Sequence, residues 1–144
     1  MYSREDFVKS VTEIVYSIVE AEEQMTKNSK FSDMTGNDMR VVAAIGIADA
    51  KNMSAIAKEL SVTVGTLTIS INSLLRKGYV LRERGIIDKR TVYISLSAKG
   101  KKAFLFRQRF FETILLKING EFTVEQQSLL YNVLIRMNKI LKDV

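Results

Sequence analysis

Arginine and lysine dominate the chemistry that this chain could perform, because histidine and cysteine are both absent. Their absence excludes disulfides, zinc sites built from thiolate or imidazole ligands, and Cys–His or Ser–His–Asp catalysis. Between Arg76 and Arg109 there are eleven basic residues and two acidic ones, so the net charge of this segment is +9. The whole chain has a net charge of +6, so the remaining residues together carry −3. A basic segment on a slightly acidic chain is typical of a polyanion-binding surface. We therefore expect a binding protein rather than an enzyme, with no catalytic residue, metal or cofactor.

A predicted helix from Val64 to Lys77 has a second face that is unusual for a solvated helix. One side is apolar, and at 100° per residue the opposite side is small and polar, with an arginine at its far end. Short hydroxyl and amide side chains approach base edges or phosphates, arginine binds guanine or a phosphate, and an isoleucine suits a thymine methyl group. The alternative is an ordinary solvated surface. The candidate DNA contacts here, including the threonine at the N-cap, are Thr63, Thr66, Thr68, Ile69, Asn72, Ser73 and Arg76.

Two short β-type runs, 80–84 and 91–96, follow this helix and are joined by the loop 85–90. The hairpin that they predict is rich in basic residues. Arg90 in particular suits a narrow A·T-rich minor groove, where negative potential is concentrated. The candidate DNA contacts of the hairpin are Arg82, Arg84, Lys89 and Arg90.

Helix caps and apolar periodicity predict the elements that position these side chains. Asn52 caps a helix over Met53–Leu60, and Ser61-Val62 form a tight turn into the helix that Thr63 caps and Gly78 ends. The order of helix, turn, helix and hairpin predicts a winged helix-turn-helix, which places one helix in a major groove and the hairpin beside it. Inward-facing residues of this motif are expected to be Ile56, Ala57, Leu60, Val64, Leu67, Ile71, Leu74 and Leu75.

Four more helices are predicted around this motif. Capping boxes at Ser3, Thr35 and Thr123 begin three of them. The first runs to about Lys27, the second to about Asp49 with Ile47 on its apolar side, and the last to near the end of the chain. The remaining helix begins after Ser97 and is expected to end at Asn119-Gly120. The fold class that we expect is mainly α, a winged helix-turn-helix with long N- and C-terminal dimerisation helices.

The hydrophobic content of 47% and mean hydropathy of +0.02 are high for a small monomer. The longest apolar run, Val41–Ala48, is too short to cross a bilayer, so no membrane partner is expected. The first residues lack a signal-peptide core, and we expect a cytoplasmic protein. Terminal helices that are apolar over more than one stripe predict a homodimer. A two-fold dimer would place the two copies of the predicted recognition helix, Val64 to Lys77, about 34 Å apart, one turn of DNA, and would require a palindromic double-stranded operator.

The hairpin and its surroundings resemble the MarR family of dimeric bacterial transcription regulators. Asp88-Lys89-Arg90 followed by Val92-Tyr93-Ile94-Ser95-Leu96-Ser97 and Gly100 is similar to that family's wing signature, with lysine for arginine and serine for threonine as departures. The resemblance implies that Asp88 braces the wing by pairing with a neighbouring arginine, for which Arg84 is a candidate. It also implies that Arg90 reaches into the minor groove. Over the whole chain it implies a single domain, 1–144, with the DNA-binding winged helix in 35–100 and dimerisation helices in 1–27 and 101–144.

The stretch from Val62 to Arg90 resembles, without gaps, the FabT-like repressors of fatty-acid synthesis in Gram-positive bacteria. This resemblance implies an inverted-repeat operator at fatty-acid synthesis genes and long-chain acyl-acyl carrier protein as corepressor and partner. An acyl chain would need an apolar tunnel, and the phenylalanines of residues 104–111 could line one, although core or dimer packing is the better explanation for any single ring. No ligand residue is assigned.

Two other functions fit the same fold. One is a MarR-type repressor that small aromatic or amphipathic compounds release from DNA. The other is a winged helix that serves only as a protein-interaction module, against which the +9 segment argues. The sequence leaves the operator, the target genes, the effector and the direction of its effect open.

Overall fold

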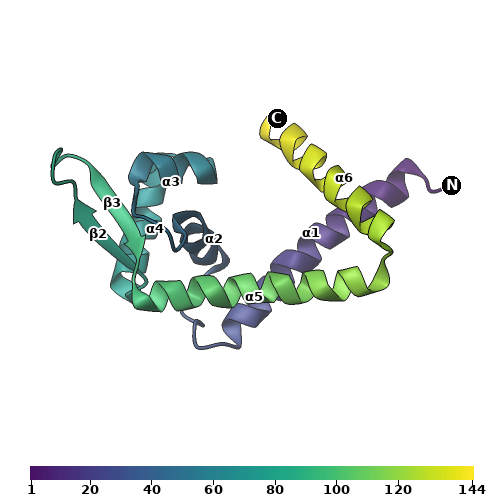
Figure 1. Cartoon of the computed structure of the whole chain (residues 1–144), viewed down its shortest axis with the longest axis horizontal. Helices are drawn as coiled ribbons and strands as arrows, with labels where there is room; N and C mark the ends of the chain where they lie inside the picture. The colour runs from purple at the N-terminus through teal and green to yellow at the C-terminus, as the bar shows by residue number, and fades with distance from the viewer. The chain divides into compact units, whose positions relative to one another are not determined.

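The computed structural model describes all 144 residues, which form six helices and three strands (Figure 1). They divide into two compact units, residues 1–107 and 108–144, and the boundary falls within the fifth helix. No helix is both long and apolar enough to span a bilayer. In chain order the elements are α1 (Arg4–Lys27), α2 (Gly36–Ile45), β1 (Lys51–Asn52), α3 (Met53–Leu60), α4 (Val64–Lys77), β2 (Val80–Arg84), β3 (Val92–Leu96), α5 (Ala98–Glu121) and α6 (Val124–Lys142).

Helix starts lie where the caps predicted them. Complete capping boxes pair Ser3 with Asp6, Thr35 with Asp38 and Thr123 with Gln126. Asn52 and Thr63 cap α3 and α4 by accepting a hydrogen bond from the backbone three residues on. The lone φ > 0 residues at the ends of α3 and α4, Ser61 and Gly78, close these helices as left-handed caps. The predicted helix-turn-helix is therefore confirmed.

Helix α2 is shorter than predicted. It ends at Ile45 rather than near Asp49, because Gly46 follows with a φ of 70°, a backbone conformation that favours glycine. Ile47, predicted on the apolar side of this helix, lies instead in the following link and is 48% exposed. The sequence analysis missed this helix end because Gly46 lies within the apolar run Val41–Ala48, which suits a longer helix.

The structure differs from the sequence analysis at three further points. Strand β1 was not predicted, because two residues carry no alternation; it pairs antiparallel with β3, Lys51 opposite Ile94. Helix α5 continues through Asn119-Gly120 to Glu121, since an isolated glycine is tolerated within a helix. Val64 is exposed in the first turn of α4, not inward.

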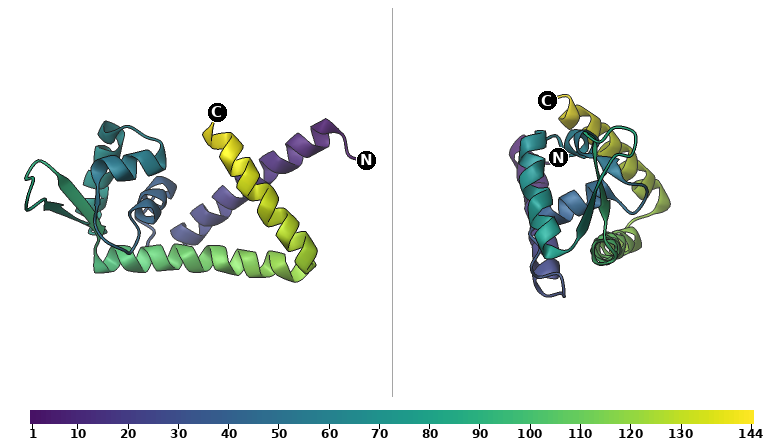
Figure 2. Two further views of the ribbon diagram at one scale, coloured as in Figure 1. Left: turned by 45° about the horizontal axis from the view of Figure 1, so that its top comes forward. Right: turned by 90° about the vertical axis from the view of Figure 1, so that its left-hand side faces the viewer.

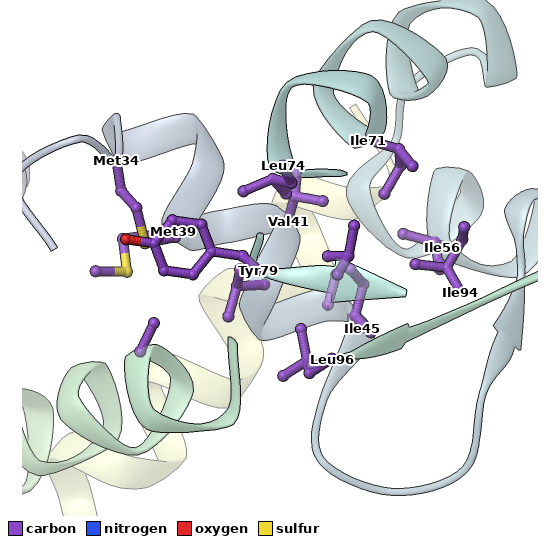
Figure 3. Packing of buried hydrophobic residues seen from close by; sticks show 14 of the residues in the cluster. Met34, Met39, Val41, Ile45, Ile56, Ile71, Leu74, Tyr79, Ile94 and Leu96 are labelled. Carbon is purple, nitrogen blue, oxygen red and sulfur yellow. The ribbon is translucent and has the colours of Figure 1, made fainter. Parts of the chain in front are cut away.

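The core of the first unit lies where α2, α3, α4 and the sheet meet, and Figure 3 shows side chains from these elements converging. The sheet has the order β1-β3-β2, and Val80 pairs with Leu96 in the register that buries Ile94 and Leu96. Tyr79, immediately before β2, is fully buried, and its ring tilts against that of Phe31 with a centroid separation of 6.3 Å. The buried apolar residues are Phe31, Met34, Met39, Val41, Val42, Ala44, Ile45, Ile56, Ala57, Leu67, Ile71, Leu74, Tyr79, Val80, Ile94, Leu96 and Ala103.

The second unit consists of the end of α5 and the whole of α6. The amide nitrogen of Gln127 donates to the carbonyl oxygens of Asn119 and Phe122, at 3.0 and 2.9 Å, and fastens the connection between the two helices. No residue of α6 is buried. Its exposed large apolar residues are Val124, Leu129, Leu130, Tyr131, Val133, Leu134, Ile135, Ile140 and Leu141.

Candidate nucleic-acid interface

The outward face of α4 has the composition that the sequence predicted. Thr66, Ile69, Asn72 and Arg76 are all exposed, and Ile69 is 74% exposed although it is a large apolar residue. Ser73 is half-buried at the edge of this face. The structure therefore brings five of the seven predicted contacts of this helix onto one accessible surface, with one positive charge near the C-terminal end.

The other two predicted contacts, Thr63 and Thr68, have hydroxyl groups that are engaged within the helix. The Thr63 hydroxyl accepts a hydrogen bond from the backbone N–H of Thr66 at 3.1 Å and donates to the Thr66 hydroxyl at 2.9 Å. Thr68 is half-buried, and its hydroxyl donates to the carbonyl oxygen of Val64 at 2.8 Å. Thr63 thus stabilises the first turn of α4 as its N-cap, and the hydroxyl group of Thr68 is occupied by the carbonyl oxygen four residues earlier.

Arg82 links the sheet to the outward face of α4. A guanidinium nitrogen of Arg82 donates to the side-chain oxygen of Asn72 at 2.8 Å. Because guanidinium has no acceptor, this bond fixes the orientation of the Asn72 amide, with its oxygen toward Arg82 and its NH₂ group elsewhere. Arg82 therefore orients the Asn72 side chain. The exposed NH₂ group of Asn72 keeps two N–H donors for another partner.

The wing is the hairpin Val80–Leu96. Its predicted DNA contacts Arg84, Lys89 and Arg90 are all exposed, so DNA could reach them. Asp88 does not pair with Arg84, contrary to the prediction: its carboxylate accepts a hydrogen bond from the backbone N–H of Arg90 at 2.9 Å. An aspartate that bonds to the backbone two residues on stabilises a turn by itself, so it needs no arginine partner. Asp88 thus braces the wing through its own loop.

Polar contacts join the end of α4 to α2 and to the beginning of α5. The Lys77 ammonium lies 2.8 Å from the Asp38 carboxylate, which also accepts the backbone N–H of Thr35 in the capping box of α2. The Ser97 hydroxyl donates to the carbonyl oxygen of Gly78 at 2.6 Å and accepts from the N–H of Gly100 at 3.1 Å, which caps α5. These bonds hold the end of α4 against the beginnings of α2 and α5.

Tyr79 provides the buried anchor of this segment. Its hydroxyl donates to the Asp33 carboxylate at 2.5 Å, and the Lys99 ammonium lies over its ring, 4.3 Å from the centroid. Burial raises the pKa of the Tyr79 hydroxyl far above its ordinary value, and the Asp33 hydrogen bond and the negative charges of Asp33 and Asp38 raise it further. The tyrosine therefore remains a neutral donor.

Sequence reasoning missed this polar cluster. Tyr79 and Asp33 are 46 positions apart, and Lys77 and Asp38 are 39 apart. Asp38 was predicted only as part of a capping box, which is a local signal. Its second partner is set by tertiary packing, for which a single sequence contains no local signal.

A cavity of about 260 Å³ lies between α1 and α2. Four of its six lining residues are polar or charged, and one of its carboxylates, that of Glu22, lies 2.5 Å from the Arg107 side chain. The lining residues are Val19, Glu22, Glu23, Gly36, Asn37 and Arg40.

A family model described as transcriptional regulator SarA/Rot matches residues 16–105. The chain belongs to the SarA/Rot family of transcriptional regulators. The HTH-type transcriptional regulator SarZ of Staphylococcus saprophyticus is 37% identical to it over 76 residues, which are 53% of this chain and 52% of SarZ. The chain therefore matches about half the length of that relative.

Two DNA-bound structures are similar to this SarA/Rot chain. Streptococcus pneumoniae FabT in complex with DNA superposes with a TM-score of 0.93 at 30% identity, over 98% of this chain and 99% of that one. The S. aureus MepR–DNA complex superposes with a TM-score of 0.77 at 18% identity, over 98% and 99%, and supports the fold alone. The predicted MarR-type winged helix-turn-helix is confirmed. The protein is a transcriptional regulator with a DNA-binding winged helix.

Proposed function

We propose that the protein is a homodimeric repressor that binds a palindromic operator, with α4 in the major groove and the wing in the adjacent minor groove. The observation that carries this proposal is the outward face of α4, where exposed Thr66, Ile69, Asn72 and Arg76 lie beside a cationic wing. Exposed donors and an apolar group on one helix face suit base edges, and the cations suit phosphates. The likeness to a DNA-bound FabT supports this docking.

Exposed apolar residues of the terminal helices support the dimer. Along α1, repeated valine, isoleucine and phenylalanine residues are exposed, and the only buried residue of this helix is Thr26. In the second unit, α6 has no buried residue at all. Leaving this many large apolar side chains in water is costly, and burial against a second copy removes that cost. The exposed large apolar residues of α1 are Phe7, Val8, Ile14, Val15, Tyr16, Ile18 and Val19.

The operator that we propose lies upstream of fatty-acid synthesis genes, with long-chain acyl-acyl carrier protein as corepressor. Two observations support this choice: the gap-free resemblance of the segment Val62–Arg90 to FabT-like repressors, and the 30% identity to pneumococcal FabT over almost the whole chain. An acyl chain can favour the DNA-bound dimer only if it binds that state more tightly than the other. At about 0.8 kcal/mol for each buried CH₂, two methylene groups suffice for a tenfold shift.

Gel shifts test this function. Duplexes from upstream of fatty-acid synthesis genes are titrated with the protein alone, with acyl carrier protein that bears a long chain, and with the carrier that bears none. We expect the acylated carrier alone to tighten binding. A complex that the acylated carrier leaves unchanged, and that a phenolic compound dissociates, would replace this proposal by a repressor released by small aromatic ligands.

A further inference from the structure

Two isoleucines stand fully exposed at the tip of the wing. Ile86 is 96% exposed and Ile87 is 102% exposed. The loop that carries them joins β2 to β3 and extends away from α2, α3 and α4 in Figure 1 and in the left view of Figure 2. Loop tips ordinarily carry small polar residues, because a large apolar side chain gains free energy only when it is removed from water. Binding of a partner surface that covers these two side chains would therefore be favourable.

The loop presents these side chains on an ordered turn. The N–H of Gly85 donates to the carbonyl oxygen of Thr91 at 2.8 Å, and the N–H of Thr91 donates to the carbonyl oxygen of Asp88 at 3.1 Å. A side chain at Gly85 would overlap the Asp88 carbonyl oxygen, so the chain can close this tightly only with glycine. With the bond from the N–H of Arg90 to the Asp88 carboxylate, both sides of the isoleucine pair are fixed.

The charges around the pair indicate what covers it. Arg84 precedes the pair, and Lys89 and Arg90 follow it, all three exposed, so they outnumber the exposed Glu83 before Arg84. The acidic side chain within the loop, Asp88, is turned onto the backbone. An apolar tip with a basic rim fits a groove that has apolar walls and anionic edges, and the DNA minor groove has both, with sugars along its walls and phosphates at its edges.

We propose that Ile86 and Ile87 pack against the sugar walls of the operator's minor groove, between phosphates that Arg84, Lys89 and Arg90 contact. This inference rests on the proposed function, because it requires that the wing enter the groove. It adds an apolar contact to the cationic ones. Apolar burial does not release counterions, so its contribution to affinity is independent of salt, whereas each phosphate contact contributes to the salt slope.

The test compares two double variants at the same positions. Ile86→Ser with Ile87→Ser removes the apolar surface, and Ile86→Val with Ile87→Val retains most of it. The DNA is a duplex that the wild-type protein selects from a random-sequence pool, so the operator need not be known. Affinity is measured over a series of salt concentrations, and hydroxyl-radical cleavage reports which sugars the protein protects.

We expect the serine variant to bind about tenfold more weakly at every salt concentration, with an unchanged salt slope and lost protection of the sugars beneath the wing. The valine variant should bind within about threefold of the wild type. Thermal unfolding should be the same for all three proteins, since these side chains are almost fully exposed in the folded chain.

Each other outcome overturns the inference in a distinguishable way. If the serine variant keeps wild-type affinity and sugar protection, the isoleucines face a different partner, such as another protein. If it reduces the salt slope as loss of a cation would, the substitutions displace the wing and the contact is not apolar. If the wild-type protein selects no duplex, the proposed function fails and this inference fails with it.

Discussion

Replacing Tyr79 by phenylalanine removes one hydroxyl group from the cluster that anchors α4. Tyr79 is 0% exposed, and its hydroxyl donates to the Asp33 carboxylate at 2.5 Å. A hydrogen bond to a charged group contributes about 1.5–3 kcal/mol. The Asp33 side chain is 46% exposed, so water replaces the lost donor, and the lower end of this range applies. We expect Tyr79→Phe to lower the free energy of unfolding by about 1.5 kcal/mol at neutral pH, and the melting temperature by about 3–6 °C.

The difference between the two proteins should disappear at high pH. The pKa of Tyr79 is raised in the folded state, so the folded protein keeps this proton where the unfolded chain has lost it. The stabilisation is therefore fully present below the unfolded pKa, about 10, and is lost as the pH rises above that value. Above that pH the unfolded chain binds one proton fewer than the folded protein, so the unfolding free energy of the wild type falls by about 1.4 kcal/mol for each pH unit. The variant lacks this group, so the two should be equally stable about one pH unit above 10.

Urea unfolding at one protein concentration, from neutral pH to about pH 11, measures both effects. Tyr2→Phe is the matched control, because Tyr2 is exposed near the N-terminus, and its loss should leave the unfolding free energy at neutral pH unchanged. A Tyr79→Phe deficit that stays constant or grows above pH 10 would refute the reasoning, since the buried hydroxyl would then not be held neutral.

Three further predictions concern the interface and the packing beneath it. Arg90→Ala should weaken operator binding by about 1–3 kcal/mol and lower the salt slope by about 1, and unchanged affinity in a salt titration would exclude the wing from the groove. Arg82→Ala should broaden the selected sequence at one position and show no further loss when combined with Asn72→Ala, whereas additive losses would mean that Arg82 binds DNA independently. Gly100→Ala should lower the unfolding free energy by about 3 kcal/mol, because a side chain there would overlap the Tyr79 carbonyl oxygen. Gly120→Ala in the same helix, with no atom within 4 Å, should raise it by about 0.5–1 kcal/mol.

The helix-turn-helix could be predicted because its signals are local. Thr63 caps α4 through an atom three residues away, and Gly78 ends the helix through its own backbone conformation. The alternation from Val92 to Leu96 likewise fixed which face of β3 is buried. The end of α2 could not be read in the same way, because Gly46 lies within an apolar run that suits a longer helix. In each case the outcome depended on whether the deciding interaction lay within a few residues.

The candidate site shows the same division. Composition and helical spacing predicted that Ile69, Asn72 and Arg76 share an accessible face, and they do. The pairing of Arg82 with Asn72 could not be predicted, since it depends on how β2 lies beside α4. The exposure of Ile86 and Ile87 also depends on the folded chain, because the same residues could have been buried under a longer loop.

The polar cluster around α4 restricts how this protein can be regulated. The end of α4 is joined to α2 by Lys77 and Asp38, and to the first turn of α5 by Ser97 and Gly100. Tyr79 adds a partly buried hydrogen bond to Asp33 in the loop before α2. Breaking these hydrogen bonds and this ion pair together would cost more free energy than the binding of an effector with modest affinity supplies. We therefore expect α4, the wing and the first turn of α5 to move as one body. An effector that changes operator affinity must therefore act on the separation of two intact copies of this body in the proposed dimer, rather than on the conformation of α4 itself.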